Sequence, residues 1–303
     1  MSSNKRPAPS SSSSAPAPKR ASSSSSSSSK PGLASIFGNK SERHPPLSNN
    51  PLTLTFKPKL EGTTKLATWN VNGLKSAGSK EKSYAFRKYC EAEKADVLVL
   101  TEVKMPGAST ADELEWLTLM YKYRYWSAPG VKDGQVAILS KVEPVAPPKF
   151  GLPEWAESDK AQADSRCITL EFEKTFLVGT YVQNSGEGKQ FMERKLKWNR
   201  DFKRYISELQ KTKPVIWTGD FNAIHDMKVT GANNWVGGDW TGSSSPGAYP
   251  RIILRIPRSF NNISIRRSIL PRVKTTEIRH EVHEHFPASS DHWPVNCVME
   301  GTL

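Results

Sequence analysis

Six consecutive residues, 217–222 (Trp-Thr-Gly-Asp-Phe-Asn), have types and a spacing that could support acid–base chemistry. Two apolar residues precede them, so the pattern predicts that they close a buried strand. Gly219 allows a sharp backbone turn, and Asp220 and Asn222 then leave the strand side by side. A carboxylate that can accept a proton, beside an amide that donates and accepts hydrogen bonds, suits the positioning of a hydrolytic water. An Asx turn has the same composition, so this motif alone leaves both interpretations open.

Other polar side chains also stand where apolar runs end. A short predicted strand over residues 65–69 is followed by Asn70 and Asn72, and the apolar run that begins at residue 96 stops at the carboxylate of Glu102. In layered folds, loops at one edge of the sheets bring such residues together. We therefore predict one site from distant parts of the chain, formed by Asn70, Glu102, Asn184, Asp220, Asn222 and the pair Asp291-His292.

The oxygen donors of this set suit Mg²⁺, with Mn²⁺ as a substitute. Glu102, Asp291 and either Asn70 or Asn72 would supply few hard ligands and leave room for water and a substrate phosphate, which is the coordination that Mg²⁺ prefers. The run of histidines at positions 280, 283 and 285 lies among charged neighbours, and we interpret it as exposed rather than as a metal site.

Two further segments are predicted to bind phosphate. The imidazole of His292 could hydrogen-bond a phosphate oxygen and stabilise charge that develops during the reaction. Tyr181 and Asn184 precede Gly186 and Gly188, which we expect to open a long helix. Backbone N–H groups and the positive end of the helix dipole would attract phosphate there.

The periodicity of apolar residues predicts a mixed fold. Strands are expected over residues 96–102, 135–140, 168–173, 175–182 and 215–220, and helices around residues 86–90 and over 191–209. The strand at 168–173 alternates apolar and polar residues, so we expect one of its faces to be wet. Most strands are apolar enough to need cover on both sides, which indicates packed sheets with helices outside.

The first 60 residues differ from the rest of the 303-residue chain. They contain two serine runs and nine Lys and Arg residues against one acid, which is +8 of the total formal charge of +13. We predict a disordered tail over residues 1–60 and a mildly basic catalytic domain over 61–303. The pairs Lys5-Arg6 and Lys19-Arg20 indicate a bipartite signal for a nuclear import receptor, although a merely solubilising tail would look similar.

Several classes of protein do not fit this sequence. The amino-terminal region has no apolar signal-peptide core, and no apolar run is long enough to cross a membrane. The three cysteines, Cys90, Cys167 and Cys297, are far apart and are expected to be reduced thiols in a core. We therefore expect a monomer in the nucleus with no membrane partner.

Five segments resemble the successive motifs of a known family. They are residues 66–74 (LATWNVNGL), 101–104 (TEVK), 181–186 (YVQNSG), 219–223 (GDFNA) and 290–294 (SDHWP). In this order they look like the motifs of the exonuclease III family of abasic-site DNA endonucleases, within the endonuclease/exonuclease/phosphatase superfamily. The resemblance implies a four-layer α/β/β/α sandwich of the DNase I type.

The resemblance also implies an activity and roles for individual residues. The activity would be Mg²⁺-dependent hydrolysis of the phosphodiester 5′ to an abasic site in double-stranded DNA, with 3′-phosphodiesterase or 3′–5′ exonuclease activity in addition. The implied catalytic residues are Tyr181, Asp220, Asn222 and His292; the implied phosphate and DNA contacts are Asn72, Lys104 and Asn184; the implied metal set is Asn70, Glu102, Asp220, Asn222, Asp291 and His292.

One stretch departs from the family pattern. Residues 243–268 match neither the aromatic block nor the Trp-Arg-x-Asp-Tyr-Phe block that the family has before its last motif, and no acid occurs from Thr241 to Thr276. The stretch is either a diverged basic loop that contacts DNA or the product of an out-of-frame or mis-spliced reading. Since His292 would lack an orienting carboxylate, a catalytically impaired DNA-binding relative is one alternative function, and a different phosphoesterase of the superfamily is another.

Overall fold

Two six-stranded sheets dominate the computed structural model. It describes residues 54–74, 79–105, 114, 116–127, 134–153, 155, 164–222, 252–253, 261–265, 267–286, 290 and 292–303. Of the tail predicted over residues 1–60, the part up to residue 53 lies outside these ranges. Residues Pro51–Leu303 form one compact unit.

The first sheet, sheet A, has the strand order β11-β12-β1-β2-β4-β3. Its strands are β1 (Thr63–Asn70), β2 (Val97–Thr101), β3 (Tyr123–Trp126), β4 (Val136–Ser140), β11 (Val273–Ile278) and β12 (Val295–Glu300). The inner strands β1 and β2 are parallel, and their neighbours on both sides run antiparallel to them.

The second sheet, sheet B, has the order β5-β6-β7-β8-β10-β9. Its strands are β5 (Lys149–Phe150), β6 (Cys167–Glu171), β7 (Phe176–Tyr181), β8 (Val215–Asp220), β9 (Ile252–Ile253) and β10 (Asn261–Ile265). Here too the inner pair, β7 and β8, is parallel and is flanked by antiparallel strands. Because parallel strands end at the same edge of a sheet, each sheet brings two strand ends together.

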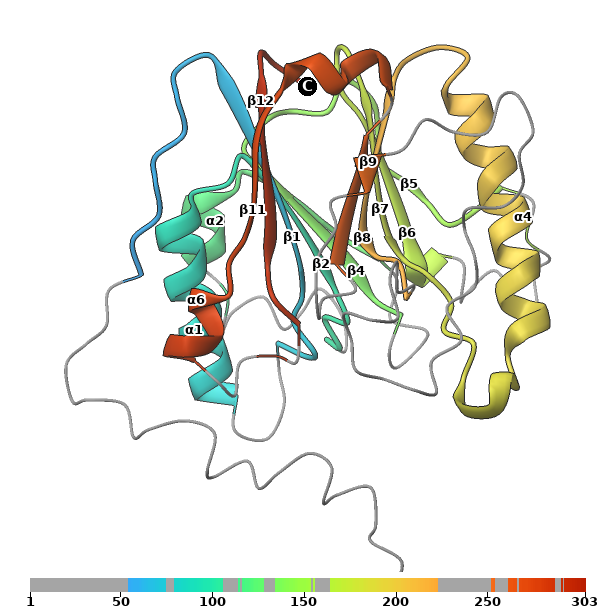
Figure 1. Cartoon of the computed structure of the whole chain (residues 1–303), viewed down its shortest axis with the longest axis horizontal. Helices are drawn as coiled ribbons and strands as arrows, with labels where there is room; N and C mark the ends of the chain where they lie inside the picture. Colours follow the sequence, from blue (N-terminus) through green and yellow to red (C-terminus); the bar gives the residue numbers. More distant parts are fainter. Residues whose placement is uncertain are drawn as a thin grey trace, which may run out of the picture. The chain divides into compact units, whose positions relative to one another are not determined.

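The sheets pack face to face with helices on both outer faces (Figure 1). Helices α1 (Ser79–Glu93), α2 (Trp116–Met120) and α6 (Glu281–His285) lie outside sheet A, and α4 (Met192–Leu209) lies outside sheet B. Three buried clusters fill the interfaces, and the middle one joins Leu66 and Val99 of sheet A to Leu170 and Ile216 of sheet B. This arrangement confirms the predicted four-layer sandwich.

Helix α4 corrects one expectation. The alternating pattern of residues 168–173 predicted a wet face, but Thr169 is buried and accepts a hydrogen bond from the Tyr205 hydroxyl at 2.8 Å. The side chains of Trp198, Phe202 and Tyr205 cover this face of sheet B. The prediction was wrong at Thr169, because a helix that lies more than 20 residues later in the chain covers it, whereas Glu171 is half-buried and Glu173 is exposed.

Part of the atypical stretch 243–268 belongs to sheet B. Residues 261–265 form β10, which pairs antiparallel with β8, and Ile263 and Ile265 are buried between the sheets. Of the five arginines in this stretch, Arg267 begins a 3-10 helix, Arg267–Arg272. The other four, which are Arg251, Arg255, Arg258 and Arg266, lie outside the described residues.

Within the described ranges, no helix combines the length and apolar character that a membrane span requires.

Candidate active site

The ends of the two parallel strand pairs meet around one buried amide. Asn70, the last residue of β1, is fully buried, and its Nδ2 donates to Glu102 Oε1 at 3.0 Å and to Asp220 Oδ2 at 2.8 Å. Glu102 follows β2 in sheet A, whereas Asp220 ends β8 in sheet B. One side chain therefore joins the two sheets where both carboxylates lie, as the sequence predicted.

A second layer of contacts fixes the sheet A side. Asn70 Oδ1 accepts a hydrogen bond from the Asn72 backbone N–H at 3.0 Å. Lys104 Nζ lies 2.9 Å from Asn72 Oδ1 and 2.8 Å from Glu102 Oε2. These contacts hold an ammonium group beside the Glu102 carboxylate, and they place the predicted phosphate contacts Asn72 and Lys104 next to the predicted metal ligands.

The exit of β8 follows from its sequence. Gly219 has φ +130°, and a Cβ at this position would collide with the carbonyl oxygen of Thr180 on β7. The backbone then turns, so that Asn222 N–H donates to Asp220 Oδ1 at 2.8 Å and Asn222 Nδ2 donates to the Val182 carbonyl at 2.9 Å. The Asx turn that was the alternative interpretation is therefore present, and it shapes the site.

Left-handed backbone conformations gather at this place. Six non-glycine residues of the described chain have positive φ, and four of them are Asn72, Glu102, Lys104 and Asn222. A left-handed conformation costs about 1–3 kcal/mol per non-glycine residue, and interactions of the surrounding structure must offset that cost. Such strain clusters at functional sites.

The electrostatics suit a base and a neutral phenol. Burial raises the pKa of Asp220, the charge of His292 opposes that shift, and the charge of Glu102 adds to it. Burial also raises the pKa of Tyr181, and the charges of Glu102 and Asp220 raise it further. Asp220 is thus a stronger base than an exposed aspartate, and Tyr181 stays protonated as a hydrogen-bond donor.

His292 is anchored from the sheet A side. Its carbonyl accepts a hydrogen bond from Trp69 Nε1 at 2.8 Å, and its backbone N–H donates to Ser290 Oγ at 3.2 Å. Ser290 Oγ in turn donates to the Asn70 carbonyl at 2.6 Å. The loop that carries the buried imidazole is thus tied to the end of β1. Asp291, a predicted metal ligand, lies outside the described residues.

Asn184 occupies a turn rather than the start of the long helix. Its Oδ1 accepts a hydrogen bond from the Gly186 backbone N–H at 2.8 Å. Gly188 lies inside a 3-10 segment, Glu187–Lys189, Gly186 directly precedes that segment, and α4 begins only at Met192. The expectation that these glycines open the long helix directly was wrong, because both have positive φ and interrupt the helical backbone.

Sequence reasoning missed two cations at the site. The Arg166 guanidinium lies 5.1 Å from the ring centroid of Tyr181. Lys195 of α4 donates from Nζ to the Asn222 carbonyl at 2.8 Å. Only Lys195 had a usable signal, because it is a cation within the apolar stripe of α4, three residues before the buried Trp198.

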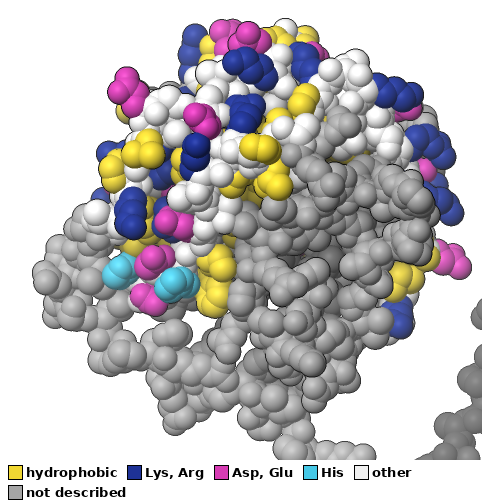
Figure 2. Space-filling model, turned by 45° about the horizontal axis from the view of Figure 1, so that its top comes forward, with side chains coloured by type: hydrophobic (Ala, Val, Ile, Leu, Met, Phe, Trp, Pro, Cys, Tyr) yellow, Lys and Arg dark blue, Asp and Glu magenta, His cyan; other side chains and the backbone are white. Residues whose placement is uncertain are grey.

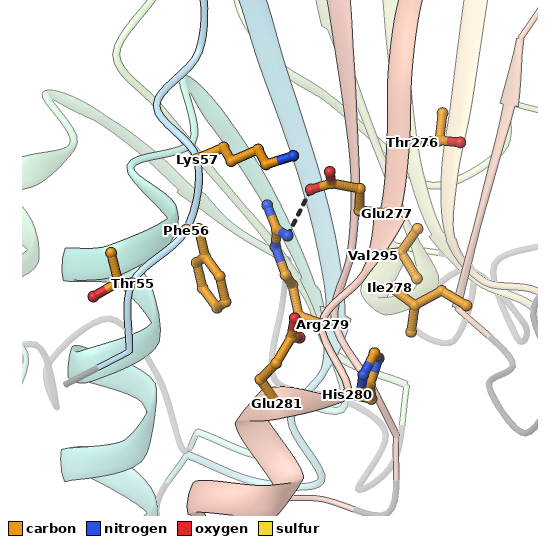
Figure 3. Close-up of a pocket in the computed structure, with 10 residues that line it drawn as sticks. All are labelled: Thr55, Phe56, Lys57, Thr276, Glu277, Ile278, Arg279, His280, Glu281 and Val295. Atoms are coloured by element: carbon orange, nitrogen blue, oxygen red, sulfur yellow. Dashed lines mark ion pairs between the residues drawn. The ribbon is translucent and has the colours of Figure 1, made fainter. Parts of the chain in front are cut away.

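Neither the histidine run nor the cavity drawn in Figure 3 coincides with the site. Within the described ranges, no three His, Cys, Asp or Glu side chains converge as they would around a metal ion. His280, from the histidine run, is exposed. A cavity of about 570 Å³ lies between Phe56 and β11 (Figure 3), and none of the predicted site residues lines it. In this cavity Arg279 forms an ion pair with Glu277, 2.6 Å away.

The donor set nevertheless fits a hard cation. Glu102 and Asp220 present two carboxylates to the same amide of Asn70, and the charge of Glu102 contributes to the raised pKa of Asp220. Oxygen donors of this number and kind suit Mg²⁺, which would relieve the repulsion between them. The six-residue metal set stays a prediction.

Comparisons with known proteins agree with this geometry. The chain is 35% identical over 173 residues to a DNA-(apurinic or apyrimidinic site) endonuclease of Dictyostelium discoideum, a match that covers 56% of this chain and 45% of that protein. It is 32% identical over 177 residues to the DNA repair nuclease APEX1 of Danio rerio, a match that covers 58% of this chain and 54% of that protein. The chain thus spans about half the length of these relatives.

A solved structure and a family model complete the comparison. One similar solved structure is that of the 3′ phosphatase NExo from Neisseria, bound to a product DNA hairpin. The match has a TM-score of 0.58 at 18% sequence identity and covers 77% of this chain and 98% of that one, so the two proteins share a fold. The model of the endonuclease/exonuclease/phosphatase family matches residues 67–292. Because this match covers about three quarters of the sequence and spans the five motifs almost entirely, we conclude that the chain belongs to the endonuclease/exonuclease/phosphatase family.

Proposed function

We propose that this protein is a Mg²⁺-dependent DNA repair endonuclease that hydrolyses the phosphodiester 5′ to abasic sites. The observation that carries the proposal is the Asn70 amide, which binds the carboxylates of Glu102 and Asp220 from two different sheets. The names of the Dictyostelium and Danio relatives support the choice of abasic DNA as the substrate.

The buried carboxylate of Asp220 would accept the proton of the attacking water. Its raised pKa makes it a better base, while the Asn70 and Asn222 N–H groups fix both of its oxygens. Asn222 would orient the same water through its side chain. In-line attack would form a bond between the water oxygen and phosphorus and break the P–O3′ bond. The leaving 3′ oxygen would take up a proton from solvent, so that the upstream fragment ends in a 3′-hydroxyl and the phosphate stays on the abasic nucleotide.

The protonated Tyr181, with Asn184 and His292, would bind the scissile phosphate and stabilise the charge that develops on its oxygens. Lys104 lies beside Glu102 and would contact the DNA backbone. A bound Mg²⁺ would polarise the phosphate and neutralise charge, and Glu102, Asp291 and Asn70 are the residues that would hold it. An abasic nucleotide lacks base stacking, so it costs less to extrude into a pocket than an intact one.

Backbone-driven DNA binding is consistent with the charge of the chain. Residues 61–303 carry only +5 of the formal charge. On the face shown in Figure 2, described Lys and Arg side chains lie interspersed with Asp and Glu. The tail with its basic pairs at Lys5-Arg6 and Lys19-Arg20 would add DNA affinity and direct the protein to the nucleus.

An incision assay tests the proposal. A 5′-labelled duplex with one abasic site should be cut only with Mg²⁺ present, and the labelled product should support primer extension because it ends in a 3′-hydroxyl. RNA and a phosphoinositide compete in parallel reactions. Hydrolysis of either competitor in preference to abasic DNA would favour another phosphoesterase of the family. DNA binding without any incision would favour a non-catalytic relative.

A further inference from the structure

Helix α4 buries one lysine that has no obvious structural use. Lys195 is only 3% exposed and lies among the apolar side chains that pack against sheet B. Its Nζ donates to the backbone carbonyl of Asn222 at 2.8 Å. Among the residues that the structure describes, no carboxylate lies within ion-pair distance of this ammonium group.

A second buried lysine shows what a structural arrangement looks like. Lys65 is also 3% exposed, but its Nζ lies 3.1 Å from Glu93 Oε1, and Arg279 and Asn296 bind the same carboxylate. Removing an ammonium from water costs several kcal/mol unless a counter-charge compensates for it. Lys195 has a carbonyl and no such directly paired carboxylate among the described residues, so the burial of its ammonium group is costly.

Asn222, whose carbonyl Lys195 binds, is held by three hydrogen bonds. Asn222 has φ +44°, a conformation that L-residues adopt at a cost. Its N–H is bound by Asp220, its Nδ2 by the Val182 carbonyl and its own carbonyl by Lys195. Without Lys195, this carbonyl would be buried with no partner among the described residues, and the turn could relax towards an unstrained conformation.

Electrostatics couple Lys195 to Asp220 as well. Burial lowers the pKa of the Lys195 ammonium, and the charge of Asp220 opposes that shift. The hydrogen bond to Asn222 and the field at Asp220 therefore act on the same three-residue turn.

We propose that Lys195 is a positioning residue that holds the Asp220–Asn222 turn in its left-handed, catalytically competent conformation from behind. This inference rests on the proposed function for its consequence on turnover. Lys195 does not bind the substrate phosphate itself, because its ammonium is buried and already donates to a main-chain carbonyl.

Kinetics of Lys195→Met test the proposal, since methionine has a similar length but no charge or donor. We expect the kcat for abasic-site incision to fall about 10–100-fold with KM unchanged, as when supporting hydrogen bonds are removed behind metal sites. The melting temperature should change little, because relief of the buried charge offsets the loss of the hydrogen bond to the Asn222 carbonyl. A variant with normal kcat, with a raised KM alone, or unable to fold would overturn the proposal.

Two control variants distinguish the loss of Lys195 itself from the loss of a lysine elsewhere on α4 or of a buried lysine elsewhere in the fold. Lys197→Met makes the same change two residues away, at a side chain that is 41% exposed, and should behave as wild type. Lys65→Met removes the other buried lysine and should lower the melting temperature with normal kcat for the folded protein. A loss of kcat in either control would contradict the assignment to Lys195.

Hydrogen exchange provides a readout that does not depend on activity. The Asn222 amide donates to Asp220 Oδ1, so a peptide spanning residues 215–222 should exchange faster in Lys195→Met than in wild type, with α4 peptides unaffected. If the wild-type chain fails to incise DNA, the proposed function fails, while this measurement still decides whether Lys195 holds the turn. Equal exchange in the two proteins would refute that role.

Discussion

The carboxylate of Asp220 is held in place by hydrogen bonds to both of its oxygens. Each of its two oxygens accepts one hydrogen bond, from Asn70 Nδ2 and from the Asn222 backbone N–H. The residue is 1% exposed, so its orientation is fixed and its ionised form is destabilised. A base in this state is poised to accept a proton, and the fold bears the cost of keeping it there.

Replacement of Asp220 by Asn should therefore abolish turnover without unfolding the protein. We expect kcat to fall by about 10²–10⁴, the usual contribution of a general base, while binding to abasic duplex persists. Single-turnover incision and fluorescence anisotropy measure the two quantities. Asp201→Asn on α4 is the matched control, because Asp201 forms its ion pair with the half-buried Lys197. A variant that retains normal turnover would remove Asp220 from the mechanism.

At the residue scale, the sequence predicted those site residues that end strands. Asn70, Glu102, Asp220 and Asn222 follow apolar runs, so local periodicity and motif order were sufficient to find them, and the structure brings them together. Lys195 is marked in the sequence only as a cation in the apolar stripe of α4, and the carbonyl that it binds lies 27 residues later in the chain. No local pattern encodes such a contact.

The parallel pairs β1–β2 and β7–β8 are the elements that build the site. Their register places Asn70 beside Thr101, and Tyr181 beside Asp220. Gly219 makes the second pairing possible, since β8 passes so close to the Thr180 carbonyl that no side chain fits between them.

Gly219→Ala should for this reason destabilise the protein strongly. We expect a loss of about 3 kcal/mol in the free energy of unfolding, from overpacking combined with backbone strain. Chemical denaturation followed by circular dichroism measures it. Gly62→Ala is the control, because Gly62 also has positive φ but an added Cβ would meet nothing within 4 Å. It should cost about 1 kcal/mol. Equal losses in the two variants would mean that the contact with Thr180 is unimportant.

At the element scale, six of the twelve strands that the structure describes and both of its long helices could be predicted from periodicity. The prediction for residues 168–173 failed at Thr169, because β6 alternates like a half-exposed strand yet lies under α4. Whether a polar face is wet depends on what packs over it, and that is decided by tertiary structure.

The positive charge of the whole chain is concentrated in its first 53 residues relative to their number. The segment 1–53 carries seven Lys and Arg residues and one acid, while the catalytic part is only mildly basic. We therefore expect this segment to contribute to the affinity for DNA, a polyanion, and to have little effect on the rate of hydrolysis.

Removal of residues 2–53 should weaken DNA binding while leaving kcat at saturating DNA unchanged. The slope of log K against log salt should become less steep, since fewer counterions are released on binding. Anisotropy titrations at several salt concentrations measure the slope. A full-length variant with the seven basic residues changed to Ser should behave like the truncation. Loss of turnover on truncation would show that the segment contributes to catalysis.

The strands that the atypical stretch supplies lie at one margin of sheet B. β10 borders β8 and β9 lies outermost, whereas the four strands whose ends carry the chemistry are all interior. Substitutions that keep Ile263 and Ile265 apolar preserve the packing beneath this margin. Since β10 pairs with β8 along the backbone, the other side chains of this margin can change while the ends of β1, β2, β7 and β8 keep their places.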